Sequence, residues 1–211
     1  MLYFKFPFGP LETNAILLGC SKTKKAAVID PSYGSMGAVL DQVQGYDLKL
    51  EKILFTHSHW DHFADAYSLK NKTDAPIYVH PLDAGNVESP GTDGIPLYIP
   101  IQPIKPDHFL NEGDVVEVGE IKLEVIHSPG HSPGGVCFYL PEEKLLISGD
   151  TLFAGSIGNL HLPTANKDQM WKSLDKLSKL PPETLVVPGH GEETTIGNEN
   201  WLSRAREIFS E

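Results

Sequence analysis

Thr56-His57-Ser58-His59-Trp60-Asp61-His62 is the stretch around which the sequence is organised. It places three histidines and an aspartate within six residues, directly behind the apolar run Ile53-Leu54-Phe55. Imidazole nitrogens and carboxylate oxygens bind divalent transition metals well, and four of them crowded together are stabilised by a cation between them. The structural alternative is a polar turn that is merely rich in histidine, and the rest of the chain argues against it.

Length and composition are those of an ordinary globular protein. The chain has 211 residues, of which 40% are hydrophobic and 21% charged, so we expect one domain spanning residues 1–211. The net charge of -11 argues against nucleic acid as a partner, because binding to phosphates depends on clustered Lys and Arg.

The sequence also carries no membrane or export signal that we can identify. No apolar run approaches the roughly 20 residues of a bilayer span, and the N-terminus lacks the pattern of a signal peptide. We therefore expect a cytoplasmic protein without a membrane partner. Cys20 and Cys137 are expected to be buried and reduced, with a single disulfide between them as the alternative.

Predicted strands and helices alternate in both halves of the chain. In the first half we expect strands at 2–6, 14–19, 26–29, 53–55 and 77–79, and helices at 37–43 and 64–70. In the second half we expect strands at 115–118, 121–125, 136–140, 145–148 and 185–187, and helices at 168–179 and 201–209. Two sheets packed face to face, with helices on their outer faces, satisfy this order.

One long segment interrupts the pattern. Five prolines and two glycines between residues 89 and 109 break any regular element there. A loop of this length is uncommon inside a compact domain and is usually functional or mobile. We expect an irregular flap, with a solvated linker as the alternative.

Polar ligands follow four apolar strands, each at its carboxyl end. The histidine-rich cluster follows 53–55, His131 follows 123–126, Asp150 follows 145–147 and His190 follows 185–187. Because open sheets place their sites outside these strand ends, we expect the ligands to converge at one edge.

The ligand count predicts two metal ions. The expected ligands are His57, His59, Asp61, His62, His131, Asp150 and His190. One catalytic zinc uses about three protein ligands, so seven fit two ions that share a bridging carboxylate and a bridging water. His57 and His59 can face the same ion, whereas Asp61 and His62 lie beyond the turn and would face the other. Asp150, which comes alone, is the natural bridge.

The other four histidines are weaker candidates. We expect His80 and His127 to be structural residues with hydrogen-bond partners, and His108 to lie in the irregular segment. His161 is a candidate for the border of the pocket.

The ligand pattern resembles the metallo-β-lactamase-fold superfamily. Within it, the segments 129–134, 148–153 and 188–191 are similar to those of hydroxyacylglutathione hydrolases (glyoxalase II). The resemblance implies an αββα four-layer sandwich of the α/β (α+β) class, with two mixed β-sheets flanked by helices. It also implies that His57, His59 and His131 hold a first metal, that Asp61, His62 and His190 hold a second, and that Asp150 bridges them.

The chain departs from full-length glyoxalase II in two places. Those proteins carry an additional C-terminal helical domain that supplies basic residues to glutathione, and here only a short stretch follows His190. The chain therefore resembles the short, single-domain glyoxalase II-like hydrolases. In those the segment after the aspartate motif commonly reads Ser-Ile-Gly-Arg-Thr-Asp, whereas here it reads Ser156-Ile157-Gly158-Asn159-Leu160-His161.

The leading functional hypothesis is hydrolysis of a thioester, such as an S-acyl-glutathione, or of a related acyl bond. A water shared by two divalent ions, with zinc favoured over iron or manganese, would supply hydroxide at neutral pH, and Asp61 would orient it. The first alternative is a mononuclear iron enzyme of the persulfide dioxygenase type, with His57, His131 and Asp150 as ligands. The second is a metal-stabilised binding module. We expect a small-molecule substrate, and the sequence does not indicate an oligomeric state.

Overall fold

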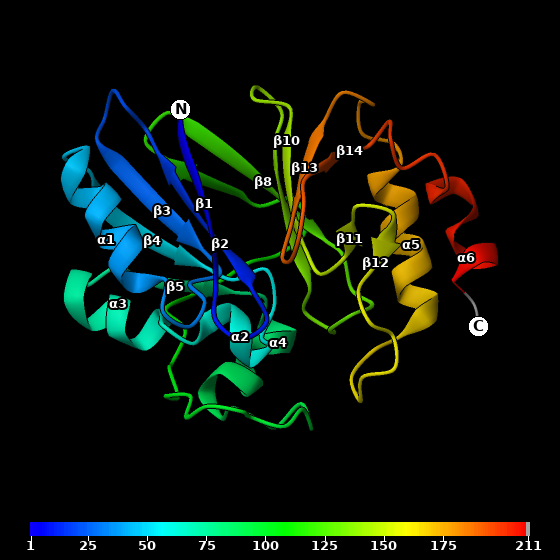
Figure 1. The fold of residues 1–211 in the computed structure, drawn as a ribbon, viewed down its shortest axis with the longest axis horizontal. Helices are drawn as coiled ribbons and strands as arrows, with labels where there is room; N and C mark the ends of the chain where they lie inside the picture. The colour runs from blue at the N-terminus through cyan, green and yellow to red at the C-terminus, as the bar shows by residue number, and fades with distance from the viewer. Residues whose placement is uncertain (210–211) are drawn as a thin grey trace.

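The computed structural model describes residues 1–209 and contains two six-stranded sheets packed face to face (Figure 1). The first sheet holds, in spatial order, β1 (Leu2–Phe8), β2 (Thr13–Gly19), β3 (Lys25–Ile29), β4 (Lys49–Leu54), β5 (Ile77–Val79) and β6 (His108–Phe109). Strands β1 to β3 pair antiparallel and β3 to β6 pair parallel, so the sheet is mixed.

The second sheet is also mixed and comes from the second half of the chain. Its strands, in spatial order, are β14 (Thr194–Thr195), β13 (Leu185–Pro188), β10 (Leu145–Gly149), β9 (Val136–Leu140), β8 (Ile121–His127) and β7 (Val115–Val118). Only β10 and β13 pair parallel. A separate two-stranded ribbon, β11 (Leu152–Phe153) with β12 (Ser156–Ile157), follows β10.

Helices cover the outer face of each sheet. Those from the first half are α1 (Met36–Gly45), α2 (Trp60–Phe63), α3 (Ala66–Thr73) and α4 (Pro81–Glu88). Those from the second half are α5 (Lys167–Leu177), a 3-10 turn at Leu202–Arg204 and α6 (Ala205–Ile208). This arrangement confirms the predicted αββα sandwich. None of the helices in residues 1–209 is long and apolar enough to span a bilayer.

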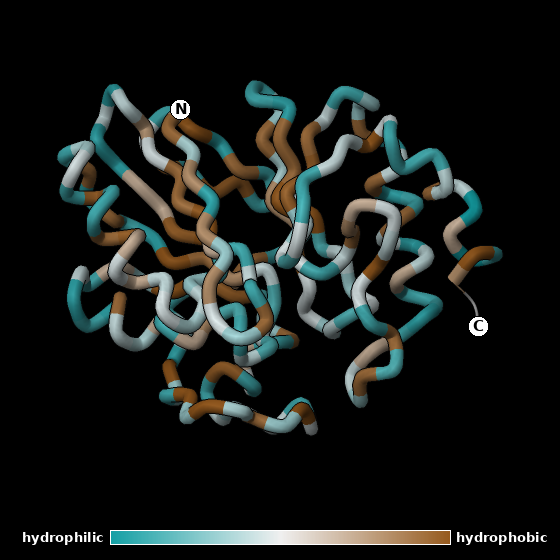
Figure 2. Tube along the Cα trace, viewed as in Figure 1, coloured by the Kyte–Doolittle hydropathy of each residue, from teal (hydrophilic) through white to brown (hydrophobic). Residues whose placement is uncertain are grey.

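The core has three apolar layers because successive residues of a strand point to opposite faces. In β2, Ile16 and Leu18 belong to the layer between the sheets, whereas Leu17 belongs to the layer beneath the first-half helices. In the second sheet, Ile147 faces the first sheet, and Leu146 packs in the layer that α5 covers. Figure 2 shows this pattern as hydrophobic strands at the centre and hydrophilic outer segments.

The terminal helix was predicted incorrectly. The structure has a 3-10 turn followed by the one-turn helix α6 in place of a continuous helix over 201–209. The apolar pattern of this segment still has a structural basis, since Leu202 and Ala205 pack in the outer layer with α5. Cys20 and Cys137 are both free and buried, as expected, so the disulfide alternative is wrong.

Two helices near the expected site were not predicted. Helix α2 spans only one turn inside the ligand cluster, and α4 follows β5 directly with Pro81 in its first turn and His80 as its N-cap. The segment 89–109 is irregular as expected up to β6. It is not a solvated linker, because Ile101 and Ile104 are buried in the core layer beneath the first-half helices.

Candidate metal centre

The histidine-rich cluster spans a change in backbone conformation. Strand β4 ends at Leu54, and His57 and His59 lie in the extended loop that follows it. His59 is the N-cap of α2 in a β conformation, and Asp61 and His62 lie inside this helical turn. The change from extended loop to helix aims the two pairs of side chains differently. This explains physically why the spacing separates the cluster into two pairs.

The remaining ligands arrive from the second sheet. His131 follows β8, Asp150 follows β10 and His190 follows β13, so three strand ends deliver them to the edge where β4 ends. Gly189 allows a close approach, because a Cβ at this position would collide with the Asp150 carboxylate and with the ring of His62. The structure thus brings all seven sequence-predicted ligands together.

The ligand atoms form two sets joined by one carboxylate. The histidine set comprises His57, His59 and His131, and the Asp61 set comprises Asp61, His62 and His190; within each set, one ligand atom per residue lies within 4.8 Å of the others. Asp150 lies between the sets. Its carboxylate oxygens are 3.3 Å from His131 Nε2, 3.4 Å from His62 Nε2 and 3.6 Å from His190 Nε2.

Hydrogen bonds on the far side of the His131 and His190 rings leave their Nε2 atoms facing the centre, whereas His59 approaches His57 Nε2 through its Nδ1. The Nδ1 of His131 lies 3.1 Å from the carbonyl of Asn159, and the Nδ1 of His190 lies 2.9 Å from the carbonyl of Leu11. Carbonyl oxygens only accept, so these nitrogens donate, and a neutral ring then presents an unprotonated Nε2. A carboxylate or carbonyl behind a histidine is the usual support of a metal-binding imidazole.

Unpartnered buried atoms test whether these residues fit metal ions. The Nε2 atoms of His59 and His131 and the Oδ1 of Asp150 are buried and have no hydrogen-bond partner. Leaving such groups unpaired in the interior costs about 1–3 kcal/mol each, so the folded protein gains when a ligand fills the space between them. Nitrogen and oxygen atoms that converge in this way fit divalent transition metals.

The charges in the centre agree with this conclusion. Burial and the neighbouring His62 hold the pKa of His57 well below its usual range, and burial lowers that of His59 to about 3. Both rings are therefore neutral at pH 7 and able to donate a lone pair. Burial opposes the charge of His62 as well, but Asp61, Asp150 and Asp30 outweigh it and raise its pKa to about 10.

Asp30 is a supporting residue that the sequence analysis did not single out. It follows β3, and its side chain is buried. It accepts bonds from the Thr56 amide at 2.7 Å, the Thr56 hydroxyl at 2.6 Å and His62 Nδ1 at 2.9 Å. The Thr56 hydroxyl also lies 3.0 Å from His57 Nδ1, so one carboxylate supports a histidine of each set. The sequence contained a signal for this residue, because Asp30 follows the carboxyl end of an apolar strand, as the predicted ligands do.

The N-terminal hairpin supports the Asp61 set. The Thr13 hydroxyl donates to Asp61 Oδ2 at 2.7 Å, and the Asn14 amide group donates to the carbonyls of Pro188 and Gly191 around His190. No short-range sequence pattern marks these two residues as part of the site. Their role follows from the contact between the start of β2 and the turn after β13.

Helix α4 supports the histidine set through the backbone. Asp83 accepts hydrogen bonds from the amide of Ser58 at 2.9 Å, the hydroxyl of Ser132 at 3.0 Å and the amide of Gly134 at 2.6 Å. Ser58 lies between His57 and His59, and Ser132 follows His131. One buried carboxylate therefore ties together two ligand loops that come from different sheets.

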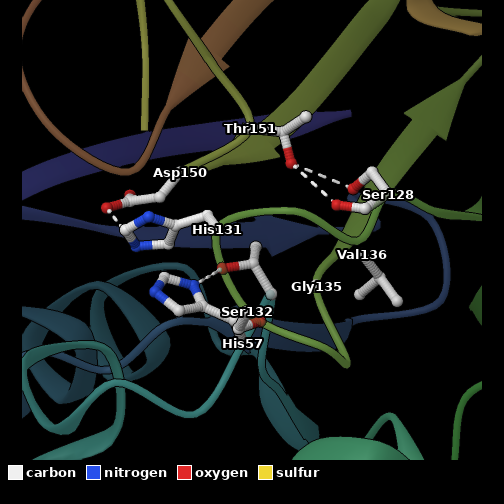
Figure 3. A pocket seen from close by; sticks show the side chains of 9 residues that line it. His57, Ser128, His131, Ser132, Gly135, Val136, Asp150 and Thr151 are labelled. Carbon is white, nitrogen blue, oxygen red and sulfur yellow. Dashed lines mark hydrogen bonds and ion pairs between the residues drawn. The ribbon is translucent and has the colours of Figure 1, made fainter. Parts of the chain in front are cut away.

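Figure 3 shows the inner wall of the centre, where the His131 ring points at the Asp150 carboxylate and His57 lies below them. A small cavity of about 10 Å³ lies among these residues, Ser128 and Thr151. This volume is the size of one water position.

The other histidines lie outside the centre. The rings of His80 and His127 stack with centroids 4.1 Å apart, and each ring has a backbone hydrogen-bond partner, as expected of structural residues. His108 stacks on Tyr78. His161 is exposed and borders a cavity of about 280 Å³ together with Asn159 and Lys167.

Known proteins are similar to this chain in sequence and in fold. A family model described as the metallo-beta-lactamase superfamily matches residues 8–190. The probable metallo-hydrolase YqgX of Bacillus subtilis is 34% identical over 203 residues, which cover 94% of each chain. The hydroxyacylglutathione hydrolase GloC of Haemophilus influenzae is 33% identical over 180 residues, which cover 83% of this chain and 84% of GloC.

Solved structures give the same result. The BLEG-1 B3 metallo-beta-lactamase has a TM-score of 0.86 at 35% identity and covers 94% of this chain and 96% of its own. TTHA1623 in a di-iron-bound form has a TM-score of 0.77 at 40% identity, covering 93% and 96%. ETHE1 from Myxococcus xanthus has a TM-score of 0.82 at 26% identity, covering 99% and 88%. The chain that carries this strand-end centre therefore belongs to the metallo-beta-lactamase superfamily.

Proposed function

We propose that the chain is a hydrolase that cleaves a thioester or a related acyl bond of a small molecule, using two divalent metal ions. The observation that carries the proposal is the pair of complete three-residue sets on either side of Asp150. A single ion would leave one of these sets without a function. The similarity to the hydroxyacylglutathione hydrolase GloC supports a thioester as the substrate class.

Bound divalent ions would acidify a shared water and polarise the scissile carbonyl, which are the two effects that acyl transfer needs most. The protein's own contribution is position. Asp61 is fixed through Oδ2 by Thr13, and we propose that it orients the attacking water. Asp150 contacts histidines of both sets and would therefore help both sets to hold their ions.

The leaving group explains why no separate general acid is required. A thiol has an ordinary pKa of about 8.5, so it departs as a thiolate near neutral pH without a proton donor. All five histidines of the centre face one another or the two carboxylates. A centre of this kind suits a thioester better than an amide, whose nitrogen must be protonated as it leaves.

The test combines elemental analysis of the purified protein with an anaerobic assay on a panel of thioesters that includes lactoyl-glutathione. We expect two metal ions per chain, zinc favoured, and hydrolysis without oxygen. Asp150→Ala should lose metal and reduce kcat/KM at least about 100-fold, because it removes the carboxylate shared by both sets. The control is Asp41→Ala on the exposed face of α1. An Asp150→Ala protein with both metals and full activity would contradict the proposal.

The likeness to ETHE1 supports a second candidate, a mononuclear iron oxygenase that uses His57, His131 and Asp150. His131 Nε2 and Asp150 are 3.3 Å apart, and the rings of His57 and His131 lie 5.0 Å apart. The same measurements separate the two functions. One iron per chain, with oxygen consumed during turnover, would favour the oxygenase.

A further inference from the structure

The β11–β12 ribbon follows Asp150 at the end of β10 (Figure 1). It touches a histidine of each ligand set. The Phe153 ring of β11 lies edge-on to the His190 ring, with centroids 6.2 Å apart. Two residues after β12, the Asn159 carbonyl accepts the hydrogen bond from His131 Nδ1 at 3.1 Å. The position of the ribbon therefore bears on both sets.

Gly158 brings the ribbon into close contact with His131. This glycine is buried, and a Cβ at its position would lie 2.9 Å from Nδ1 of the ring. The backbone between β12 and Asn159 therefore packs directly on the imidazole. A metal ligand must be held within about 0.5 Å of its working position, so even a small displacement of this backbone would disturb His131.

The ribbon is too short to hold this position by itself. Each of its strands has two residues, and an isolated two-stranded hairpin is at best marginally stable in water. The first strand is fixed to β10, because the Ser148 hydroxyl donates to the Leu152 carbonyl at 2.7 Å. The turn at 154–156 is exposed, so it needs support from another part of the fold.

The side chain of Glu199 provides this support. It is only 5% exposed, and its Oε2 accepts hydrogen bonds from the Gly155 amide at 2.8 Å and from Trp201 Nε1 at 2.6 Å. Its Oε1 accepts from the Thr194 hydroxyl at 2.5 Å. Thr194 and Trp201 are close to Glu199 in the chain, whereas Gly155 precedes it by 44 residues. The carboxylate therefore joins the C-terminal segment to the turn of the ribbon.

This hydrogen bond does what apolar packing cannot do. Ile157 of β12 packs against the outer apolar layer that α5 covers, but apolar contact is not directional and would let the ribbon slide along this layer. Hydrogen bonds to a carboxylate are short and depend on direction. The bond from Gly155 to Glu199 therefore fixes where the turn lies, and Asn159 follows this turn by only four residues.

We propose that Glu199 is a positioning residue, which fixes the β11–β12 ribbon against the metal centre and, through the Asn159 carbonyl, the orientation of His131. The alternative is a local role, in which Glu199 only closes the turn with Thr194 and Trp201. The effect on catalysis rests on the proposed function, whereas the effect on His131 does not. The two roles differ in what they predict, because only the positioning role extends to the metal centre.

Three variants separate the two roles. Glu199→Met removes all three hydrogen bonds. Glu199→Gln keeps them, because the amide oxygen accepts from Gly155 and Trp201 and the amide nitrogen donates to the Thr194 hydroxyl oxygen. The double variant Thr194→Val/Trp201→Phe is the matched control, because it removes the two local bonds and leaves the bond to Gly155.

The first measurement is proton NMR with saturating zinc, which does not depend on activity. We expect Glu199→Met to speed hydrogen exchange of the Gly155 amide by at least about tenfold and to shift or broaden the signal of the His131 Nδ1 proton. Glu199→Gln should restore both signals, and the double variant should retain both. Natural signals in Glu199→Met, or the same changes in the double variant, would overturn the positioning role. If Glu199→Met does not fold, Glu199→Asp, which is one methylene shorter, gives the same test.

Kinetics then separate the failure of this inference from the failure of the proposed function. We expect Glu199→Met to lower kcat of thioester hydrolysis about fivefold and to change KM less than twofold, because Glu199 acts one step further from the metal than a direct partner of a ligand. If no thioester is hydrolysed but the NMR differences hold, the proposed function is wrong and the positioning role stands. If thioesters are hydrolysed and Glu199→Met keeps the natural kcat and His131 signal, the positioning role is wrong.

Discussion

The two ligand sets of the centre are supported in different ways. In the Asp61 set, every side chain makes a direct hydrogen bond to a partner outside the set: Asp61 to Thr13, His62 to Asp30 and His190 to the Leu11 carbonyl. In the histidine set, His57 and His131 also have partners outside the set, the Thr56 hydroxyl and the Asn159 carbonyl. Within residues 1–209, the hydrogen-bond partner of the His59 ring is His57 of the same set, 3.0 Å away, so the position of His59 depends on how its loop is held.

That difference assigns separate tasks to separate parts of the fold. The N-terminal hairpin orients the side chains of the Asp61 set, Asp83 and Asn86 of α4 hold the backbone of the loops that carry the histidine set, and Asp30 supports both sets. A ring without a partner outside its set, such as His59, depends more on its backbone than the rings of the Asp61 set do. Variants that each remove one supporting hydrogen-bond partner can therefore weaken metal binding at the two sets separately.

The largest effect is expected for Asp30→Asn, because Asp30 supports both sets. An amide cannot accept from both Thr56 groups and from His62 at once, so at least one buried donor loses its partner. We expect metal affinity to fall about 100-fold at both sets and the free energy of unfolding to fall by about 3 kcal/mol. Calorimetric metal titration and urea denaturation measure these effects. Asp41→Asn is the control, and unchanged values in Asp30→Asn would contradict the shared support.

A more selective effect is expected for Asp83→Asn. The amide keeps one acceptor oxygen, so either the Ser58 or the Gly134 amide loses its bond, at about 1–2 kcal/mol. We expect metal affinity to fall about tenfold at the histidine set alone, and kcat to fall more than KM changes. Cobalt titration followed by visible absorption resolves successive metal ions.

Ser132→Ala is the matched control for Asp83→Asn, since it removes only the side-chain bond to Asp83 and leaves both backbone bonds. Its loss of affinity should be smaller. Equal losses at the two metal sites in Asp83→Asn would contradict the separate support of the sets.

The sequence predicts more of this centre than of its support. The seven expected ligands converge because each follows a strand, and strand ends of the two sheets meet at one edge; that they bind metal stays a prediction. Asp30 follows the same rule after β3 and was missed because it comes alone and without a histidine. The rule therefore extends to single carboxylates at the ends of buried strands.

Thr13, Asp83 and Asn86 could not be predicted in this way. Their roles arise where segments distant in the chain pack together, such as Thr13 with Asp61 and Asp83 with Gly134. The need for glycine at position 134 could not be predicted either, because it arises from the packing of Asp83 against this position. A Cβ there would lie 2.6 Å from the Asp83 side chain. The prediction of a continuous terminal helix was wrong for a different reason. The apolar spacing of residues 201–209 indicates burial against α5, and burial does not require a continuous helix.

A smaller and more local effect is expected for Thr13→Val. The change removes the hydroxyl that donates to Asp61 Oδ2 and leaves the shape almost unchanged. Asp61 then lacks a hydrogen bond worth about 1 kcal/mol that holds its carboxylate in position. Metal affinity at the Asp61 set should therefore fall by about fivefold to tenfold, and the histidine set should keep its metal. Thr184→Val is a stringent control, because the Thr184 hydroxyl is buried without a hydrogen-bond partner. Weaker binding at the histidine set in Thr13→Val would contradict the comparison.

The smallest effect concerns acid stability on the side of the histidine set. His80 begins α4, the helix that carries Asp83 and Asn86, and burial together with His127 lowers its pKa to about 4. The unfolded chain binds this proton near its ordinary pKa of about 6.5, so stability is lost as the pH falls from about 6.5 towards 4. His80→Asn keeps an acceptor for the Leu82 amide, because Asn is a good N-cap, and it removes the titration. We expect its loss of unfolding free energy between pH 6.5 and 4.5 to be smaller than that of the natural chain by about 1–3 kcal/mol. Urea denaturation of both proteins in the presence of a chelator measures this difference without interference from metal release. Equal losses of unfolding free energy in the two proteins would show that the stacked His80 and His127 do not cause the acid sensitivity.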